Sequence, residues 1–244
     1  MTRYWAVLSM GSTYKDEGLV QDESEIPYYY NQLGKRNPLY FQNENYPLRV
    51  GGRKIKDQNG DGRIDSKDMY YAGSALPQAY GGITNQITYK DFTLNVLFTY
   101  TLGRKMMNMV KNGAFNFNQK FGVVMNDFNK ATFWKKPGDK TQFPSLDFAD
   151  SGYIGQFDGD IDSNIETVSY LRLKQLSLSY SLPANWVKRF RLKDARIYLS
   201  GENLFLLTNY SGLDPEIVNP YTGKDTGEMY PLNRKFSLGL NLKF

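Results

Sequence analysis

Several stretches of the chain alternate between apolar and polar residues, which is the pattern of β-strands with one apolar face. In FTLNVLFTYT, every second residue from Phe92 to Tyr100 is apolar, and Leu97 is the one apolar residue on the other face. The last stretch, RKFSLGLNLKF, alternates without a break up to Phe244. With RYWAVLSM near the start, the pattern predicts about six strands, near residues 2–9, 79–89, 92–102, 167–181, 194–206 and 234–244.

Two local features set how these strands connect. Residues 90–91 separate two alternating runs, and this spacing predicts a tight hairpin. In VSYLRLKQLSLSYSLP the apolar positions change parity between Leu173 and Leu176. A one-residue shift of this kind predicts a β-bulge near residues 174–175.

The connections alternate between long and short. Long polar segments occupy approximately residues 10–78, 103–166 and 207–232, whereas the connections at 90–91 and 182–193 are short. All long loops then fall at one end of the strands, as in outer-membrane barrels with long external loops and short periplasmic turns. Polar residues within the strands suit a wet lumen. The row ending in a C-terminal Phe resembles the signal by which such barrels are recognised for assembly.

Composition supports an all-β chain and narrows its chemistry. Aromatic residues are plentiful, with 19 Tyr and 15 Phe among 244 residues, and both types favour strands. Cys and His are absent, so any metal must be held by oxygen. The net charge is +5, but the Lys and Arg residues are scattered among acidic residues and form no basic run, which argues against nucleic-acid binding. We find no nucleophile with a neighbouring base, no phosphate-binding loop and no pair of carboxylates typical of a glycosidase, so we expect that the protein is not an enzyme. The sequence contains no apolar run long enough for a membrane helix.

The stretch DQNGDGRIDSKD, residues 57–68, has the spacing of a calcium-binding loop. Such loops place oxygen ligands at positions 1, 3, 5, 7, 9 and 12, with Gly at position 6, so that alternate groups converge on one hard cation. Gly62 stands at position 6, and position 12 is Asp instead of the usual Glu. The candidate ligands are Asp57, Asn59, Asp61, the backbone carbonyl of Arg63, Asp65 and Asp68. We expect a structural Ca²⁺ here; the alternative is a turn without an ion.

Two further polar clusters have simpler interpretations. The stretch DFADSGYIGQFDGDIDSNIE contains six acidic residues, and we interpret it as a solvated external loop, with a second ion as the alternative. Tyr28, Tyr29 and Tyr30 are suited to stacking on sugar rings, but a loop cluster packed on its neighbours has the same sequence.

Three blocks carry a family resemblance. They are KDQNGDGRIDSKDMYYAGSALPQAYGGITNQITYKDFTLNVLFTY, SYLRLKQLSLSYSLPANWVKRFRLKDARIYLSGENLFLLTNYSGLDPE and YPLNRKFSLGLNLKF. Their order and spacing resemble the closing portion of SusC/RagA-type TonB-linked outer-membrane proteins of Bacteroidetes. The resemblance covers most of the chain after about residue 50.

The resemblance implies a fold, a location and partners. The fold is all-β: antiparallel transmembrane strands from the C-terminal part of a barrel of roughly 22 strands, with long extracellular loops. Residues 1–244 then form a C-terminal barrel region in the outer membrane, without the plug domain. The implied partners are a SusD-like lipoprotein, TonB acting through the missing plug, the lipid bilayer and an oligosaccharide or peptide cargo. The alternative is a soluble calcium-binding β-sandwich for adhesion or carbohydrate binding.

Overall fold

The computed structural model describes residues 13–41, 46–110, 132–141, 143–145, 161–219 and 222–244. The chain divides into two compact units. The first, called the loop unit here, comprises Met1–Ala75, Lys105–Glu166 and Asn219–Glu228. The second, called the strand unit, comprises Leu76–Arg104, Thr167–Val218 and Met229–Phe244.

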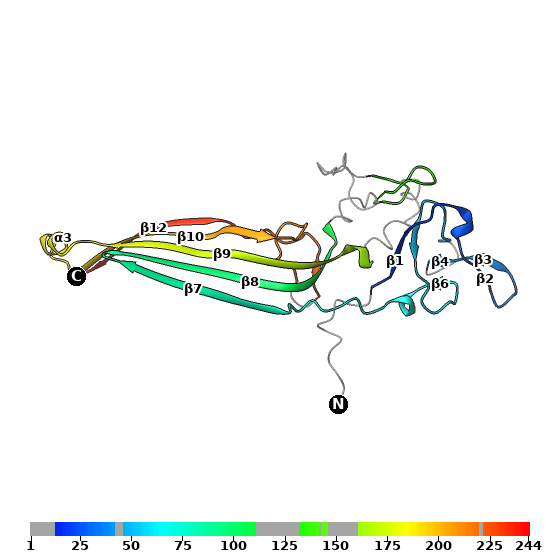
Figure 1. Cartoon of the computed structure of the whole chain (residues 1–244), viewed down its shortest axis with the longest axis horizontal. Coiled ribbons are helices and arrows are strands. Elements are labelled where there is room, and N and C mark those ends of the chain that lie inside the picture. Colours follow the sequence, from blue (N-terminus) through cyan, green and yellow to red (C-terminus); the bar gives the residue numbers. More distant parts are fainter. Residues whose placement is uncertain (1–12, 42–45, 111–131, 142, 146–160, 220–221) are drawn as a thin grey trace, which may run out of the picture. The chain divides into compact units, whose positions relative to one another are not determined.

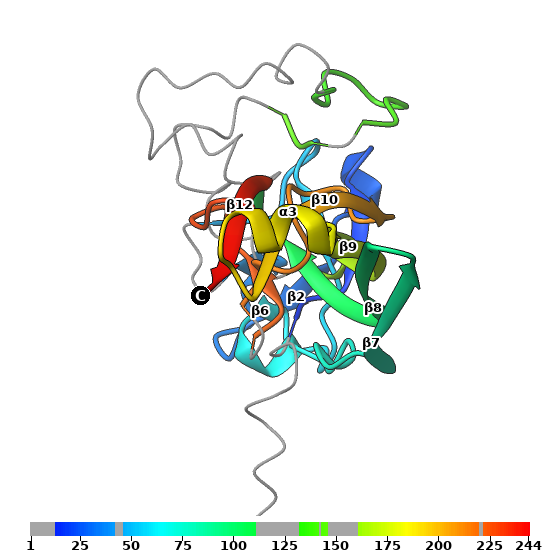
Figure 2. The ribbon, with the colours of Figure 1, turned by 90° about the vertical axis from the view of Figure 1, so that its left-hand side faces the viewer.

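Long strands that lie side by side form the strand unit (Figure 1). They are β7 (Ala79–Tyr89), β8 (Phe92–Asn108), β9 (Ile165–Ser181), β10 (Asp194–Thr208) and β12 (Lys235–Lys243). The end of β8 from Lys105 and the start of β9 up to Glu166 belong to the loop unit. The order of these strands across the sheet, β7-β8-β9-β10-β12, is their order along the chain. The pairings of β7 with β8, β9 with β10 and β10 with β12 are antiparallel. The short helix α3 (Ala184–Arg189) connects β9 to β10 at the end of the strands that faces the viewer in Figure 2. This meander is the arrangement expected of a barrel wall.

The strands follow the alternating stretches closely. Strand β7 covers the predicted range, β8 extends six residues beyond residue 102, and β9 starts at Ile165, two residues early. The predicted strand near residues 2–9 lies outside the described residues. Lys90, with φ of +54°, opens the two-residue turn between β7 and β8, so the predicted hairpin is confirmed.

The predicted irregularity in β9 coincides with a shift in its pairing. Glu202 of β10 pairs with Gln175 of β9, and Phe205 of β10 pairs with Leu173 of β9. Between these two pairs β10 advances by three residues and β9 by two. Asn203 lies within the shift and has φ of +53°. The extra residue of this β-bulge therefore belongs to β10. The irregularity lies at the predicted place along the pair, but the bulged strand is the partner of the one predicted.

The two faces of the sheet differ in chemistry. Leu240 pairs with Ile197 and is 59% exposed, and the whole apolar row of β12 is exposed in the same way. On the opposite face, Ser237 pairs with Ser200. In the strand unit the apolar side chains thus point to the surrounding medium, the reverse of a soluble sheet. None of the helices in the described ranges is long and apolar enough to cross a membrane.

The loop unit consists of short strands. Strand β1 (Asp16–Leu19) is antiparallel to β5 (Arg53–Ile55), and β2 (Tyr28–Tyr30) is antiparallel to β3 (Arg36–Pro38). Strand β4 (Tyr40–Phe41) is parallel to β6 (Arg63–Ile64), and β11 (Lys224–Asp225) is parallel to the end of β8. Three 3₁₀ turns complete the described part of the unit: η2 (Glu23–Glu25), η3 (Ser66–Asp68) and η6 (Asp162–Asn164).

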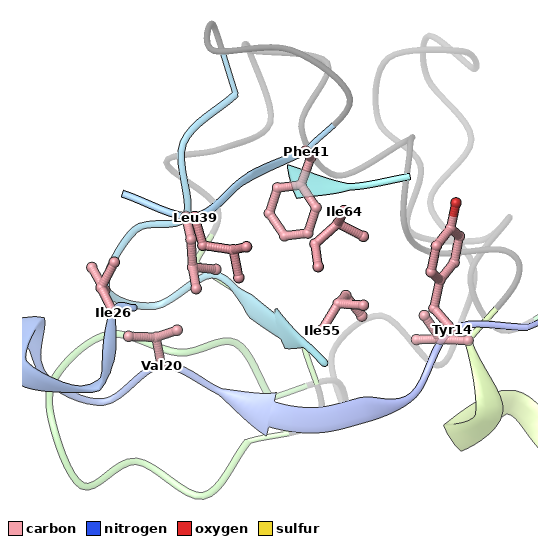
Figure 3. Close-up of a cluster of buried hydrophobic side chains, with 9 residues drawn as sticks. Tyr14, Val20, Ile26, Leu39, Phe41, Ile55 and Ile64 are labelled. Atoms are coloured by element: carbon pink, nitrogen blue, oxygen red, sulfur yellow. The ribbon is translucent and has the colours of Figure 1, made fainter. Parts of the chain in front are cut away.

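An apolar core holds the loop unit together (Figure 3). Strands β4, β5 and β6 contribute Phe41, Ile55 and Ile64, and the other side chains come from segments outside the strands, including Tyr14 and Val20 on either side of β1. The buried members are Tyr14, Val20, Ile26, Leu39, Phe41, Leu48, Ile55, Ile64 and Ile161. The long segment before β7 is therefore a folded body with an apolar interior, so the loop unit follows the burial rule of water-soluble domains.

Candidate functional site

The calcium-like loop, residues 57–68, is fixed between the core and a tyrosine ring. Ile64 is fully buried in the core and pairs through β6 with Phe41 of β4. Gly62 adopts φ of +83°, and a Cβ atom there would lie 2.6 Å from Cγ of Tyr29. Only glycine satisfies both the left-handed backbone and the close approach of the ring. The glycine predicted from the motif is required by the fold itself.

The polar side chains of the loop bind mainly its own backbone. Both carboxylate oxygens of Asp57 accept hydrogen bonds, Oδ1 from the N–H of Gly60 at 2.7 Å and Oδ2 from the N–H of Gly62 at 2.8 Å. Asn59 Nδ2 donates to Asp61 Oδ2 at 3.0 Å. These bonds close a tight turn of the type that Asn-Gly and Asp-Gly dipeptides favour.

Asp68, at the twelfth position, is completely buried beneath the loop. Its Oδ1 accepts from the N–H of Gln58 at 2.8 Å, and its Oδ2 accepts from the N–H of Asp65 at 2.8 Å. Burial is the main cause that raises the pKa of Asp68, and these backbone donors oppose the rise. Burial, followed by the nearby carboxylates of the loop, also raises the pKa of Tyr29. Both shifts indicate a site of negative potential that is partly removed from water.

The donor set suits a hard cation, but the side chains do not gather as a metal site. All six predicted ligands belong to one loop and offer oxygen, as Ca²⁺ requires. In the described residues, however, no group of three or more acidic side chains converges in a way that could hold a metal ion. Coordination would therefore require some carboxylates to exchange backbone N–H donors for the ion.

Asp162 belongs to the acidic stretch predicted to be a solvated loop, and it has a structural role instead. It joins segments far apart in sequence, because its carboxylate accepts from Lys15 Nζ at 2.7 Å, the N–H of Asp16 at 2.9 Å and Tyr70 Oη at 2.6 Å. Burial raises the pKa of Asp162, but the hydrogen bonds from Lys15, Tyr70 and Asp16 outweigh it and leave this pKa below the ordinary 3.8. In the same stretch, Glu166 accepts a hydrogen bond from Asn108 Nδ2 at 3.2 Å. The stretch's four other acidic residues lie outside the described residues.

A buried charge cluster lies on the polar face of the strand unit. Arg172 of β9 places Nη2 2.5 Å from Asp214 Oδ1 and Nε 3.3 Å from Glu216 Oε2. Lys174 Nζ lies 2.9 Å from the same Glu216 oxygen. The side chains of Arg172 and Asp214 are only 3% and 4% exposed. Sequence reasoning missed this cluster, although the charges inside a strand and the Asp-Pro-Glu sequence at 214–216 were signals for it.

The two acidic residues of this cluster belong to the connection between β10 and β12. They lie in its first limb, residues 209–218. Asp214 Oδ2 also accepts from the N–H of Leu232 at 3.2 Å, in the limb that returns to β12. One carboxylate thus holds both limbs of the connection against β9.

A third feature is the exposed aromatic surface of the β2–β3 hairpin. Tyr28 and Tyr30 are 44% and 74% exposed, and the guanidinium of Arg36 lies 4.2 Å from the centroid of the Tyr28 ring. Tyr29 faces the other way and packs on Gly62. Two of the three predicted aromatic residues are therefore available to a partner, and the third is structural.

These features define a class of protein. Long antiparallel strands with an exposed apolar face and a polar opposite face form part of the wall of a transmembrane β-barrel. Residues before β7, together with Ile161 from the connection between β8 and β9, form a compact unit with its own core.

Comparison with known proteins identifies the type of barrel. The chain is 30% identical over 205 residues to the TonB-dependent receptor P3 of Formosa agariphila, and the match covers 80% of the chain and 19% of the receptor. It is 31% identical over 209 residues to receptor P26 of the same organism, with 81% of the chain and 20% of the receptor covered. It is 29% identical over 189 residues to the TonB-dependent receptor SusC of Bacteroides thetaiotaomicron, with 77% and 17% covered. No family model matches the chain.

Solved structures agree on the fold. The chain resembles the RagAB peptide importer in its open-open state with a TM-score of 0.59 and 22% identity, over 96% of this chain and 22% of that one. For the closed-closed state the TM-score is 0.54, with 20% identity over 96% of this chain and 23% of that one.

The comparisons confirm three of the predictions. The recognition as a SusC/RagA-type TonB-dependent chain, the all-β barrel fold class and the outer-membrane location are all correct. The soluble sandwich alternative has no support among these relatives, which are receptors and importers. The chain spans about a fifth of the length of the curated relatives it matches. That this fifth is the C-terminal end stays a prediction.

Proposed function

We propose that this chain supplies wall strands and external loops to a TonB-dependent importer in the outer membrane. The observation that carries the proposal is that the strand unit has one apolar, exposed face and one polar face, in a chain whose relatives are TonB-dependent receptors. The strand unit places apolar side chains toward lipid and polar ones toward the lumen. The long strands in the described residues are too few to close a pore, so transport requires the rest of a longer protein.

We further propose that the importer works with a SusD-like lipoprotein and carries oligosaccharides or peptides. RagAB, a structural neighbour, is a peptide importer, and SusC is a curated relative. The exposed Tyr28 and Tyr30 beside Arg36 are suited to contact with a partner or a cargo, because aromatic rings and Arg are enriched at interfaces.

Uptake by whole cells tests this proposal. A strain lacking the complete protein should lose growth on one class of cargo, oligosaccharide or peptide, and a strain lacking TonB should lose growth on the same class. Affinity purification of the complete protein in detergent should recover a lipoprotein of the SusD type. Normal growth of the deletion strain on both classes of cargo would contradict the import function. Purification without a lipoprotein would contradict the partner alone.

For the calcium-like loop we propose a structural role for Ca²⁺. The support is the buried Asp68, together with the burial and, after it, the neighbouring carboxylates that raise the pKa values of Asp68 and Tyr29. A divalent cation would relieve the negative potential of these carboxylates, and the oxygen donors suit Ca²⁺. Hydrogen exchange across residues 57–68 should slow when excess Ca²⁺ is added and recover with a chelator. Exchange that does not respond to either treatment would exclude the ion from this loop.

A further inference from the structure

An apolar groove of about 610 Å³ opens on the apolar face of the strand unit. Ile83 of β7, Tyr100 and Leu102 of β8, Leu171 of β9 and Leu207 of β10 line it, and almost no polar surface is exposed within it. Leu171 and Leu207 are directly opposite each other in the β9–β10 pairing and form one wall. The groove lies toward the strand ends that are remote from the two-residue turn at Lys90.

Small residues and the direction of one ring create this space. Tyr100 pairs with Gly81 and leans over it, since a Cβ atom on Gly81 would lie 2.9 Å from the Tyr100 hydroxyl oxygen. The ring therefore covers β7 and leaves the surface toward β9 open. On that side stands Ser169, whose hydroxyl accepts a hydrogen bond from the N–H of Gly103 at 3.1 Å. The sequence thus leaves a hollow between bulky walls.

Neither water nor a polar ligand suits this groove. A bound water needs two to four polar partners, and the walls are hydrocarbon. The amide of Asn209 at the rim is already committed: its Oδ1 accepts from the N–H of Ser169 at 2.8 Å, and its Nδ2 donates to the carbonyl of Thr167 at 2.9 Å. An empty groove would forfeit dispersion contacts along its walls. The groove therefore favours an unbranched hydrocarbon chain over a ligand recognised by its head group.

The surroundings of the groove identify the source of that hydrocarbon. The same face continues along β7 and β12 with exposed side chains such as Ile87 and Leu240, at 55% and 59%. In a barrel wall this face borders the bilayer, and the ends remote from short turns are external. We propose that the groove binds one acyl chain of an outer-leaflet lipid, an inference that rests on the proposed barrel function. The lipid is held by its chain at a defined site, in contrast to the exchanging lipid along the rest of the wall.

Native mass spectrometry of the complete protein extracted from its own outer membrane tests the inference. The wild type should retain one lipid adduct, and the adduct mass identifies it as a phospholipid or a lipopolysaccharide. Leu207→Trp fills the groove and should lower the retained fraction at least about tenfold, since losing contact with two methylene groups accounts for such a factor. Leu240→Trp is the matched control, because Leu240 and Leu207 are on the same face at 59% and 60% exposure. It should retain the adduct.

The possible results separate the groove from the barrel. A wild type without an adduct, an adduct unaffected by L207W, or one lost equally in L240W would overturn the groove inference while leaving the barrel intact. If L207W fails to insert, Leu102→Trp fills the groove from the β8 side and carries the same expectation. Failure of the wild type to appear in the outer membrane would instead refute the proposed function. Cargo uptake should be equal in L207W and L240W, because the groove faces lipid.

Discussion

Replacing Arg172 by Met should release the first limb of the β10–β12 connection from the strand unit. The substitution keeps a long unbranched side chain in the space but removes the cation that faces Asp214 and Glu216. Both carboxylates are then left on a face where Asp214 is almost fully buried, and a buried charge without a partner is costly.

The size of the effect follows from the contacts that remain. Removing one partner of a buried ion pair costs about 3–5 kcal/mol. Asp214 keeps the backbone donors of Glu216 and Leu232, at 3.0 and 3.2 Å, which should hold the loss to the lower end, about 3 kcal/mol. Local opening of residues 213–218 would then become easier by about two orders of magnitude.

Hydrogen exchange of residues 213–218 in the complete, detergent-extracted protein measures this opening. Lys174→Met is the control, because Lys174 is 38% exposed and should contribute less than about 1 kcal/mol. A double variant with Asp214→Asn should lose less than the sum of the two single variants, since the residues are in contact. Equal exchange in R172M and K174M would refute the view that the Arg172 pair holds the connection.

Three further substitutions test the loop unit by hydrogen exchange. Gly62→Ala should lower the stability of the loop more than Gly60→Ala does. Both positions have positive φ, where a side chain costs about 1–2 kcal/mol, but only Gly62 lies against Tyr29. Equal losses of stability would show that the Tyr29 ring does not contribute to the requirement for glycine. Asp68→Ala should destabilise residues 57–68 by about 2 kcal/mol, since three backbone N–H groups lose their acceptor; unchanged exchange there would contradict its anchoring role. Asp162 stabilises the unit above its ordinary pKa of 3.8, and this contribution disappears as the pH falls through its lowered folded-state pKa. Protection of β1 should therefore fall on acidification in the wild type but stay level in Asp162→Asn, and an equal fall in both would assign the pH dependence to another group.

The strands could be predicted from sequence because each obeys a local rule. Alternation with a period of two needs no knowledge of distant residues, so β7 and β12 appear almost where the pattern places them. The irregularity near residue 174 was predicted for the same reason, since a change of parity is visible in one strand, but its extra residue lies in β10, which the parity of β9 does not show.

The loop unit could not be predicted in this way. Its strands are two to four residues long, too short to establish a period, and its core residues are irregularly spaced. Its ties are also remote in sequence: Asp162 meets Lys15 across 147 positions. That residues 57–68 bind an ion stays a prediction, and the burial of Asp68 and the packing of Tyr29 on Gly62 depend on contacts that no spacing reveals.

The two units follow opposite burial rules within one chain. In the loop unit Ile64 and Phe41 are buried while charged residues such as Asp61 and Lys67 are exposed, as expected in water. In the strand unit Leu238 and Phe236 are 77% and 73% exposed while Arg172 is buried, as expected where hydrocarbon lies outside and polar groups lie within. A single hydropathy average over both units mixes these opposite trends, which is why a mean hydropathy of −0.55 coexists with membrane strands. The direction in which each face points, and not the average composition, distinguishes the part of this chain built for lipid from the part built for water.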